Sequence, residues 1–283
     1  MTTHEDLQDG AALLERMIAA AIEAGAAILE YYASDFEIRS KADESPVTAA
    51  DHASEAVILA RLRQAAPGIP IVAEEEVAAG RVPAVGRAFF LVDPLDGTKE
   101  FVQRRGDFTV NIALIQDAAP ALGVVYAPAR GWLYAGNVRT GEAFRMRIDE
   151  GSRTPGPRER IRVRSVPDSG ITAVASRSHR TPETDDFLAK YRVAELVSIG
   201  SSLKFCLVAA GEADLYPRFG TTMEWDTAAG HAVLLAAGGS AVTPEGAPLR
   251  YGKPEFRNSH FIASGSVPTP HAGEPRHPPE RLQ

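Results

Sequence analysis

The sequence is poor in cysteine and has no long apolar run. Its 283 residues include one cysteine, Cys206, so no internal disulfide can form. No Cys and His residues lie at the spacing of a structural zinc site, so oxygen ligands would have to hold any metal. Without disulfides the reducing cytoplasm is the expected compartment.

Positive charge is also scarce. The 37 Asp and Glu residues outnumber the 30 Lys and Arg residues, and the net charge is −7. This excess of negative charge argues against a nucleic-acid partner. Any anionic ligand must bind to a few cationic side chains gathered at one site. No run of about 18 apolar residues predicts a transmembrane segment, and the polar N-terminus lacks the basic flank of a secretory signal. Peripheral association with the inner membrane, and the choice between monomer and homodimer, stay open.

Apolar residues make up 45% of the chain, enough for a folded protein with a sizeable core. The first half predicts two helices packed on a largely antiparallel sheet. Helical spacing covers residues 10–32 and 49–65. Short apolar or alternating runs predict strands at 70–73, 88–92, 108–116, 121–126, 131–135 and 160–164.

The second half alternates strand and helix, which predicts an α/β lobe. The expected strands are 171–176, 194–199, 213–217 and 260–264, and the expected helices are 185–191, 202–210 and 227–237. We therefore predict an N-terminal α+β lobe at 1–165, a C-terminal α/β lobe at 166–265 and a disordered, proline-rich tail at 266–283.

The most informative stretch is FFLVDPLDGTKEF at 89–101, within which we call residues 93–98 the aspartate loop. A buried strand leads into Asp93 and Asp96, placed around a proline that fixes the turn. Gly97 lets backbone N–H groups approach an anion, so the loop can present carboxylates to a cation and the Gly97 and Thr98 N–H groups to a phosphate. Taken alone, the Asp-Gly pair is more typical of a surface turn.

Two further acidic clusters bear on this loop. Glu74 to Glu76 follow the strand IPIVA, and Asp226 lies in EWDT at the start of a helix. Singly, these are typical of a solvated charge run and of a helix N-cap. Carboxylates gathered at one site repel one another, so they require divalent cations. Hard oxygen ligands favour Mg²⁺, and two Mg²⁺ ions sharing a carboxylate form a phosphoryl-transfer site.

Together, DPLDGT at 93–98, Glu74 upstream and WDTAAG at 225–230 resemble the signature of the inositol monophosphatase superfamily of Mg²⁺-dependent, Li⁺-sensitive phosphatases. The resemblance runs from the helix before Thr48 to about Gly265. It implies a layered α-β-α-β-α sandwich, with an antiparallel sheet in the N-terminal lobe and an α/β C-terminal lobe.

The resemblance also implies two or three Mg²⁺ ions. Glu74, Asp93 and the Leu95 carbonyl would hold the first ion, and Asp93, Asp96 and Asp226 the second. Apart from Asp93, these ligands, with Gly97 and Thr98, would also contact the substrate.

The catalytic group implied is Asp51, Thr98 and Glu74. Asp51 would pair with the Thr98 hydroxyl to orient and deprotonate the attacking water. Without the resemblance, Asp51 is interpreted as an acid in the first turn of a helix capped by Thr48, where the helix dipole favours a negative charge.

Three local features bear on the substrate. The aspartate loop continues Lys99-Glu100-Phe101, where inositol monophosphatases tend to carry Asn before the Phe. The run GSSLKF at 200–205 enters a helix, and Arg218 stands where the inositol enzymes place a glutamate. A cation there favours a substrate with a second phosphate.

These features are similar to those of CysQ-type 3′(2′),5′-bisphosphate nucleotidases, which hydrolyse 3′-phosphoadenosine 5′-phosphate to AMP and phosphate in sulfate assimilation. The resemblance implies that Ser201, Lys204 and Arg218 contact the nucleotide, with His179 as a further candidate. The ordinary interpretations are a surface lysine, an exposed arginine and an exposed loop histidine.

Two other functions stay open. An inositol-1-phosphate or sugar-phosphate phosphatase would share the fold. A non-catalytic nucleotide-binding protein is disfavoured, because it usually lacks part of the acidic set that is complete here. Cys206 and His231 are interpreted as packed structural residues.

Overall fold

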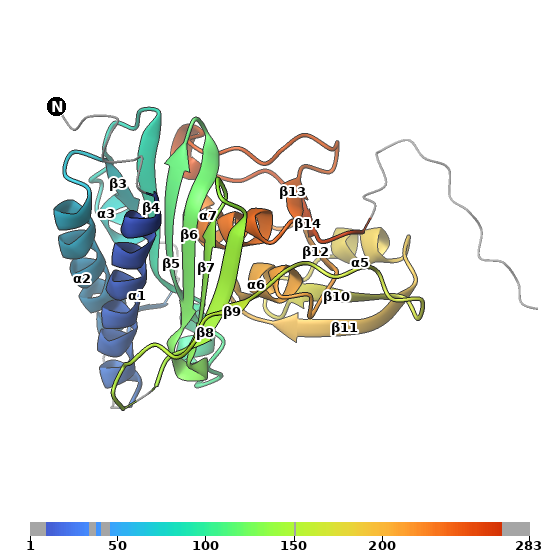
Figure 1. The fold of residues 1–283 in the computed structure, drawn as a ribbon, viewed down its shortest axis with the longest axis horizontal. Coiled ribbons are helices and arrows are strands. Elements are labelled where there is room, and N and C mark those ends of the chain that lie inside the picture. Colours follow the sequence, from blue (N-terminus) through green and yellow to red (C-terminus); the bar gives the residue numbers. More distant parts are fainter. Residues whose placement is uncertain (1–9, 34–37, 41–45, 150, 268–283) are drawn as a thin grey trace, which may run out of the picture.

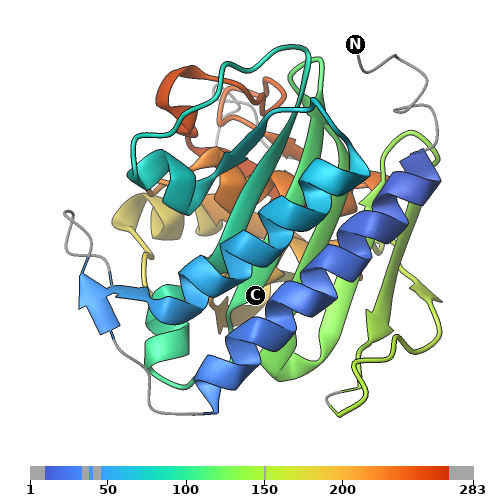
Figure 2. The same cartoon turned by 90° about the vertical axis from the view of Figure 1, so that its left-hand side faces the viewer.

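The computed structural model describes residues 10–33, 38–40, 46–149 and 151–267, with the backbone alone at 38–40 and 46–48. The chain forms five layers in the order α-β-α-β-α (Figure 1). Helices α1 (Gly10–Tyr32) and α2 (Ala49–Ala65) lie side by side on the outer face of the larger sheet (Figure 2). Leu13, Leu14 and Met17 bury the inner face of α1 against that sheet.

The larger sheet has seven strands in the order β3-β4-β5-β6-β7-β8-β9. β3 and β4 run parallel and every other neighbouring pair is antiparallel, so this part of the chain is a meander. The strands are β3 (Ile71–Ala73), β4 (Ala88–Asp96), β5 (Thr109–Gln116), β6 (Ala119–Ala127), β7 (Trp132–Asn137), β8 (Glu142–Arg147) and β9 (Glu159–Arg160). Short segments β1 (Ile38–Ser40) and β2 (Pro46–Thr48) pair separately.

The middle layer consists of α6 (Leu203–Ala209) and α7 (Glu224–Ala236), which pack between the two sheets (Figure 1). α7 approaches the larger sheet closely because two glycines face it. A Cβ on Gly123 would lie 2.4 Å from the Ala229 carbonyl oxygen, and one on Gly136 would lie 2.7 Å from the Val233 Cα. These contacts set how closely α7 packs on the larger sheet, and they thereby determine the position of Asp226 on that helix.

Gly123→Ala is therefore expected to lower the free energy of unfolding by about 2 kcal/mol, because the added methyl group meets helix backbone that cannot turn aside. The same change at Gly86 is the control, since a Cβ there has no atom within 4 Å. Urea unfolding of both variants measures the difference. Equal stability of the two would contradict the close packing of α7.

The smaller sheet has five strands in the order β11-β10-β12-β14-β13. One face packs on the middle helices, where Val174 joins Phe205 of α6 in one apolar cluster. The other face carries Ile171 and Ala173 against Phe187 of α5. The remaining elements are β10 (Ile171–Ser176), α5 (Pro182–Leu188), β11 (Val193–Ile199), β12 (Leu215–Arg218), β13 (Ser240–Val242) and β14 (Phe261–Ser264), with 3-10 turns at Pro128–Arg130 and Pro254–Phe256.

The predicted five-layer arrangement and both N-terminal helices are confirmed. The strand predicted at 160–164 is wrong beyond Arg160, where the chain leaves the sheet. β8 and β13 were not predicted, although Phe144 and Met146 of β8 alternate with Arg145 and Arg147. α7 begins at Glu224, three residues earlier than expected.

The predicted cap at Thr48 falls where no side chain is described, and residues 268–283 of the predicted tail also lie outside the described residues. The lobe boundary near residue 165 stays a prediction. Within the described part of the chain, no helix is long and apolar enough to cross a membrane.

Candidate active site

A cavity of about 270 Å³ opens where the end of β4 meets α6, α7 and the end of β12. It is lined from both halves of the chain. Every predicted site residue except Asp51 lines it: Glu74, Asp93, Leu95, Asp96, Gly97, Thr98, His179, Ser201, Lys204, Arg218 and Asp226.

The first four residues of the aspartate loop, 93–96, are the irregular end of β4 and not a loop after it. The pairing of β4 with β5 is interrupted between Asp93 and Asp96, which turns both carboxylates away from the regular ladder. Asp93 is buried, and its Oδ1 accepts the Leu95 N–H at 3.0 Å. Gly97 has φ +93°, and a Cβ on it would lie 3.1 Å from the Asp107 carbonyl oxygen.

A buried network holds Asp96. Its Oδ2 accepts the Ser202 N–H at 2.6 Å and the Asn111 side-chain amide at 3.4 Å. The Ser202 hydroxyl in turn donates to Asn111 Oδ1 at 2.6 Å. Sequence reasoning missed Ser202 and Asn111, although one signal was present: Asn111 interrupts the apolar run TVNIALI of β5. This network joins the aspartate loop to the start of α6.

Asp51 lies in the first turn of α2, buried but outside the lining of the cavity. One turn later, the Ser54 hydroxyl donates to the Pro94 carbonyl at 2.9 Å, which holds α2 against the aspartate loop. The Thr98 hydroxyl donates to the Leu95 carbonyl at 3.3 Å. The predicted pairing of Asp51 with Thr98 stays a prediction.

Glu74 opens the short helix α3 (Glu74–Ala78) immediately after β3, so the acidic run is helical. The buried carboxylate of Glu55, on α2, accepts the Glu75 N–H at 2.9 Å and so holds the start of this helix. Burial, with the nearby charges of Glu75 and Glu76, raises the pKa of Glu55 to about 7. Glu74 is thereby held at the wall of the cavity, beside the aspartate loop.

The acidic side of the cavity is electrostatically crowded. Burial, followed by the charges of the neighbouring carboxylates, raises the pKa of Asp93 well above its usual range, and Asp51 is among those neighbours. Burial also raises the pKa of Asp96 to about 6, opposed by the Lys204 charge and the Ser202 N–H. Asp226 is shifted in the same direction, again mainly by burial.

Such a set of carboxylates fits a hard divalent cation. Four carboxylates and the Leu95 carbonyl are all oxygen donors, the type that Mg²⁺ prefers. Burial, with the charges of neighbouring carboxylates, raises the pKa of Asp93, Asp96 and Asp226, and a bound cation would offset these poorly solvated charges. Among the residues described, no three Asp, Glu, His or Cys side chains already converge on one point.

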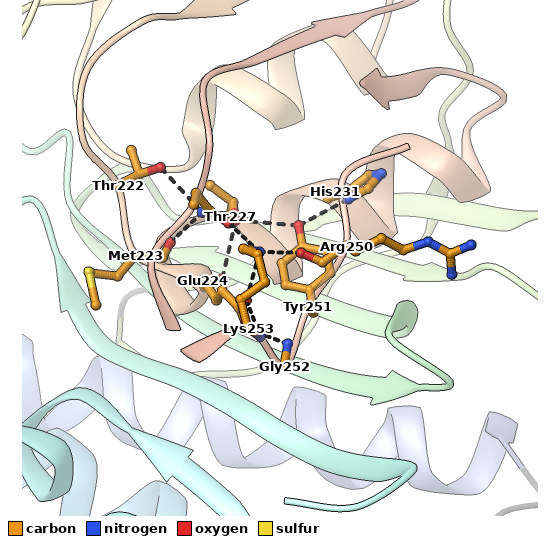
Figure 3. Close-up of polar contacts among 10 residues, drawn as sticks. Thr222, Met223, Glu224, Thr227, His231, Arg250, Tyr251, Gly252 and Lys253 are labelled. Carbon is orange, nitrogen blue, oxygen red and sulfur yellow. Dashed lines mark hydrogen bonds and ion pairs between the residues drawn. The ribbon is translucent and has the colours of Figure 1, made fainter. Parts of the chain in front are cut away.

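The N-terminal end of α7 is tightly anchored through Glu224 (Figure 3). Glu224 is fully buried, and its carboxylate accepts the N–H groups of Gly252 at 2.7 Å and Lys253 at 3.0 Å. The Lys253 ammonium pairs with it at 2.7 Å. Asp226 itself accepts the Met223 N–H at 2.8 Å, so it caps the helix from its third position while it lines the cavity.

One turn further along α7, His231 is buried as expected for a structural residue. Its Nδ1 lies 3.0 Å from the Tyr251 hydroxyl, which also lies 3.3 Å from the Thr227 hydroxyl (Figure 3). Burial lowers the pKa of His231 to about 3. The folded protein therefore keeps this imidazole neutral at pH values where the unfolded chain binds a proton.

The free energy of unfolding should consequently decrease as pH falls from about 6.5 toward 3, by about 1.4 kcal/mol per pH unit from this group. His231→Gln is expected to remove that share of the slope. Urea unfolding at pH 6.5 and 4.5 measures it, with exposed His260→Gln as the matched control. An unchanged slope in His231→Gln would show that burial does not exclude the proton.

The opposite side of the cavity carries cations from the second half of the chain. Lys204 is 5% exposed and donates to the Ser201 carbonyl. Burial lowers its pKa to about 8, so it remains mostly charged at neutral pH. Arg218 is 7% exposed, and its Nε is buried without a hydrogen-bond partner among the described residues. Ser201 has φ +51°, a strained backbone conformation at the cavity wall.

His179 lies on the segment after β10, exposed but at the edge of the same cavity. Desolvation and the charges of Arg218 and Lys99 lower its pKa, which favours the neutral imidazole. Lys99 and Glu100 also line the cavity. The sequence alone suggested only that they help to distinguish the subfamilies.

Cys206 is fully buried, and burial raises the pKa of its thiol, in keeping with a packed structural residue.

Comparison with known proteins agrees with this geometry. The family model for the inositol monophosphatase family matches residues 10–271. The chain belongs to the inositol monophosphatase family. Among members of the family, it is 46% identical over 255 residues to the 3′(2′),5′-bisphosphate nucleotidase CysQ of Escherichia coli O157:H7, across 89% of this chain and 99% of the relative.

Solved structures of the family are also similar. The crystal structure of CysQ from Bacteroides thetaiotaomicron matches with a TM-score of 0.75 and 41% identity, covering 90% of this chain and 97% of that one. An inositol monophosphatase from Anabaena matches with a TM-score of 0.68 and 29% identity, covering 89% and 90%. The family expected from the sequence is thus confirmed.

Proposed function

We propose that this protein is a Mg²⁺-dependent phosphomonoesterase that hydrolyses 3′(2′)-phosphoadenosine 5′-phosphate to AMP and phosphate. The observation that carries the proposal is the two-sided cavity, in which Asp93, Asp96 and Asp226 face the buried cations Lys204 and Arg218. One side suits a metal-assisted phosphoryl site. The other side suits a second, non-reacting phosphate. The names of the CysQ relatives point to the same substrate.

We assign the metal ligands to the acidic side. They would be Glu74, Asp93, Asp96, Asp226 and the Leu95 carbonyl, in a site for two or three Mg²⁺ ions. Bound there, Mg²⁺ lowers the pKa of water and offsets charge on the phosphoryl group.

The chain's own groups complete the reaction. We assign to Asp51, which is buried and whose charge acts on Asp93, the role of accepting a proton from the attacking water through the Thr98 hydroxyl that orients this water. The N–H groups of Gly97 and Thr98 bind phosphoryl oxygens where negative charge develops. Glu74 completes the catalytic set from the same acidic side of the cavity, beside Asp93.

The second phosphate of the nucleotide binds on the cationic side. Lys204 and Arg218 neutralise it, Ser201 donates its hydroxyl, and His179 closes the rim. Because both cations are buried, their attraction for an anion is screened less than that of surface charges. A neutral polyol offers no matching anion, so inositol 1-phosphate is expected to be the poorer substrate. We place the enzyme in the cytoplasm, where the single cysteine stays reduced.

The test is a phosphate-release assay on 3′-phosphoadenosine 5′-phosphate, inositol 1-phosphate and the small ester glycerol 2-phosphate. Each is measured with Mg²⁺, with Mg²⁺ and millimolar Li⁺, and with a chelator. We expect the nucleotide to have the highest kcat/KM, and Li⁺ or chelation to abolish release. Preference for inositol 1-phosphate would assign the chain to the inositol branch, and release that survives chelation would refute the metal site.

A further inference from the structure

The segment 177–181, between β10 and α5, places a backbone acceptor beside the cationic side of the cavity. The carbonyl of His179 accepts a hydrogen bond from Arg218 Nη1 at 3.4 Å. The other terminal nitrogen of Arg218 donates to the Thr221 carbonyl at 3.0 Å. Two carbonyls thus orient the Arg218 guanidinium. One of them, that of His179, belongs to an exposed segment, so its position depends on what holds that segment in place.

That anchor is an ion pair between the two halves of the chain. Arg177 Nη1 lies 2.5 Å from Oδ2 of Asp107, and Arg177 Nη2 donates to the Ser198 carbonyl at 2.9 Å. Asp107, which precedes β5, is 1% exposed. Its Oδ1 accepts Nε of Arg130 at 3.0 Å. One buried carboxylate is therefore shared by an arginine from each half.

A second contact ties the same segment to the end of the aspartate loop. The Ser178 hydroxyl donates to Glu100 Oε1 at 2.8 Å, and Glu100 is 5% exposed in α4 (Thr98–Val102). The chain after β11 also packs against Glu100, since a Cβ on Gly200 would lie 2.6 Å from the Glu100 Cγ. The segment therefore has little freedom relative to the aspartate loop while both contacts hold.

We propose that Arg177, through its ion pair with Asp107, is a positioning residue that holds the His179 carbonyl in place and so orients Arg218 for the non-reacting phosphate. This deepens the proposed nucleotidase function and rests on it. Arg177 does not line the cavity, so it acts only through the segment that it anchors. Its loss should change substrate affinity more than the chemical step.

Arg177→Met keeps most of the side-chain length but removes all donors. Asp107 retains Arg130, so the buried carboxylate stays paired and the fold is expected to persist. We expect KM for 3′-phosphoadenosine 5′-phosphate to rise about tenfold while kcat changes less than about twofold. The preference for this substrate over glycerol 2-phosphate should fall by the same factor. Arg177→Lys should restore part of it, because an ammonium can still reach one acceptor.

Arg180→Met is the matched control. Arg180 belongs to the same exposed segment and pairs with Asp185 of α5, within its own half of the chain. A change in net charge alone would affect both variants equally, whereas positioning affects only Arg177→Met. In an Arg218→Met background, adding Arg177→Met should change KM less than about twofold, since the residue that it orients is gone.

Amide hydrogen exchange of segment 177–181 gives a readout that needs no substrate. Faster exchange in Arg177→Met than in Arg180→Met is expected. Equal exchange and equal KM in these two variants, or additivity with Arg218→Met, would overturn the positioning role. If the wild type instead shows no preference for the nucleotide, the proposed function fails, and the exchange comparison alone decides whether Arg177 anchors the segment.

Discussion

Asp93→Asn is expected to lower turnover of 3′-phosphoadenosine 5′-phosphate by at least about a thousandfold. Asp93 is buried at the centre of the acidic side, and the charges of Glu74, Asp96 and Asp226 all act on it. Asparagine has nearly the same shape and still accepts the Leu95 N–H, so the aspartate loop should keep its course. What is lost is the negative charge that we assign to both metal sites.

For the same variant we also expect two changes in stability, one without metal and one with Mg²⁺. Without metal, its free energy of unfolding should exceed that of the wild type, because a buried and repelled charge is removed. The stabilisation that Mg²⁺ gives the wild type, measured as a rise in Tm, should disappear. Asp117→Asn, at an exposed turn of the same sheet, is the control. An Asp93→Asn protein that still turns over, or that Mg²⁺ still stabilises, would refute the ligand assignment.

Arg218→Glu should raise KM for the nucleotide by at least about a hundredfold. The change replaces a nearly buried cation by an anion facing the second phosphate, and opposite charges at about 4 Å interact by about 4 kcal/mol near a protein surface. The effect on kcat/KM should be much smaller for glycerol 2-phosphate, which has no second phosphate to repel.

Isothermal titration with AMP, the expected product, gives a second measure for Arg218→Glu, because AMP carries the 5′-phosphate alone. Arg180→Glu makes the same charge reversal outside the cavity and is the control. Unchanged nucleotide affinity in Arg218→Glu, or equal losses in both variants, would contradict the subfamily assignment and favour a sugar phosphate as substrate.

The aspartate loop was predictable because its chemistry is local. Asp93, Pro94, Asp96 and Gly97 come directly after the apolar run at 89–92, and that order alone indicates carboxylates beside backbone donors. The two long N-terminal helices were equally predictable, since each buries one face at regular helical spacing.

What the sequence did not reveal are the contacts made across long separations. Ser202 holds Asp96 over a gap of 106 residues, and Arg177 reaches Asp107 over a gap of 70. Serine, asparagine and arginine are common in loops, and no local spacing marks those that meet a distant carboxylate. Such partners become visible only once both sheets and the middle helices are packed together.

The glycine contacts of α7 also restrict how the enzyme can move. Asp226 comes from the second half of the chain, yet its helix is seated directly on the larger sheet at Gly123 and Gly136. A hinge that swung the two sheets apart would have to break this seat. The floor of the cavity is therefore expected to keep its shape during turnover, because moving Asp226 away from the aspartate loop would require α7 to leave this seat.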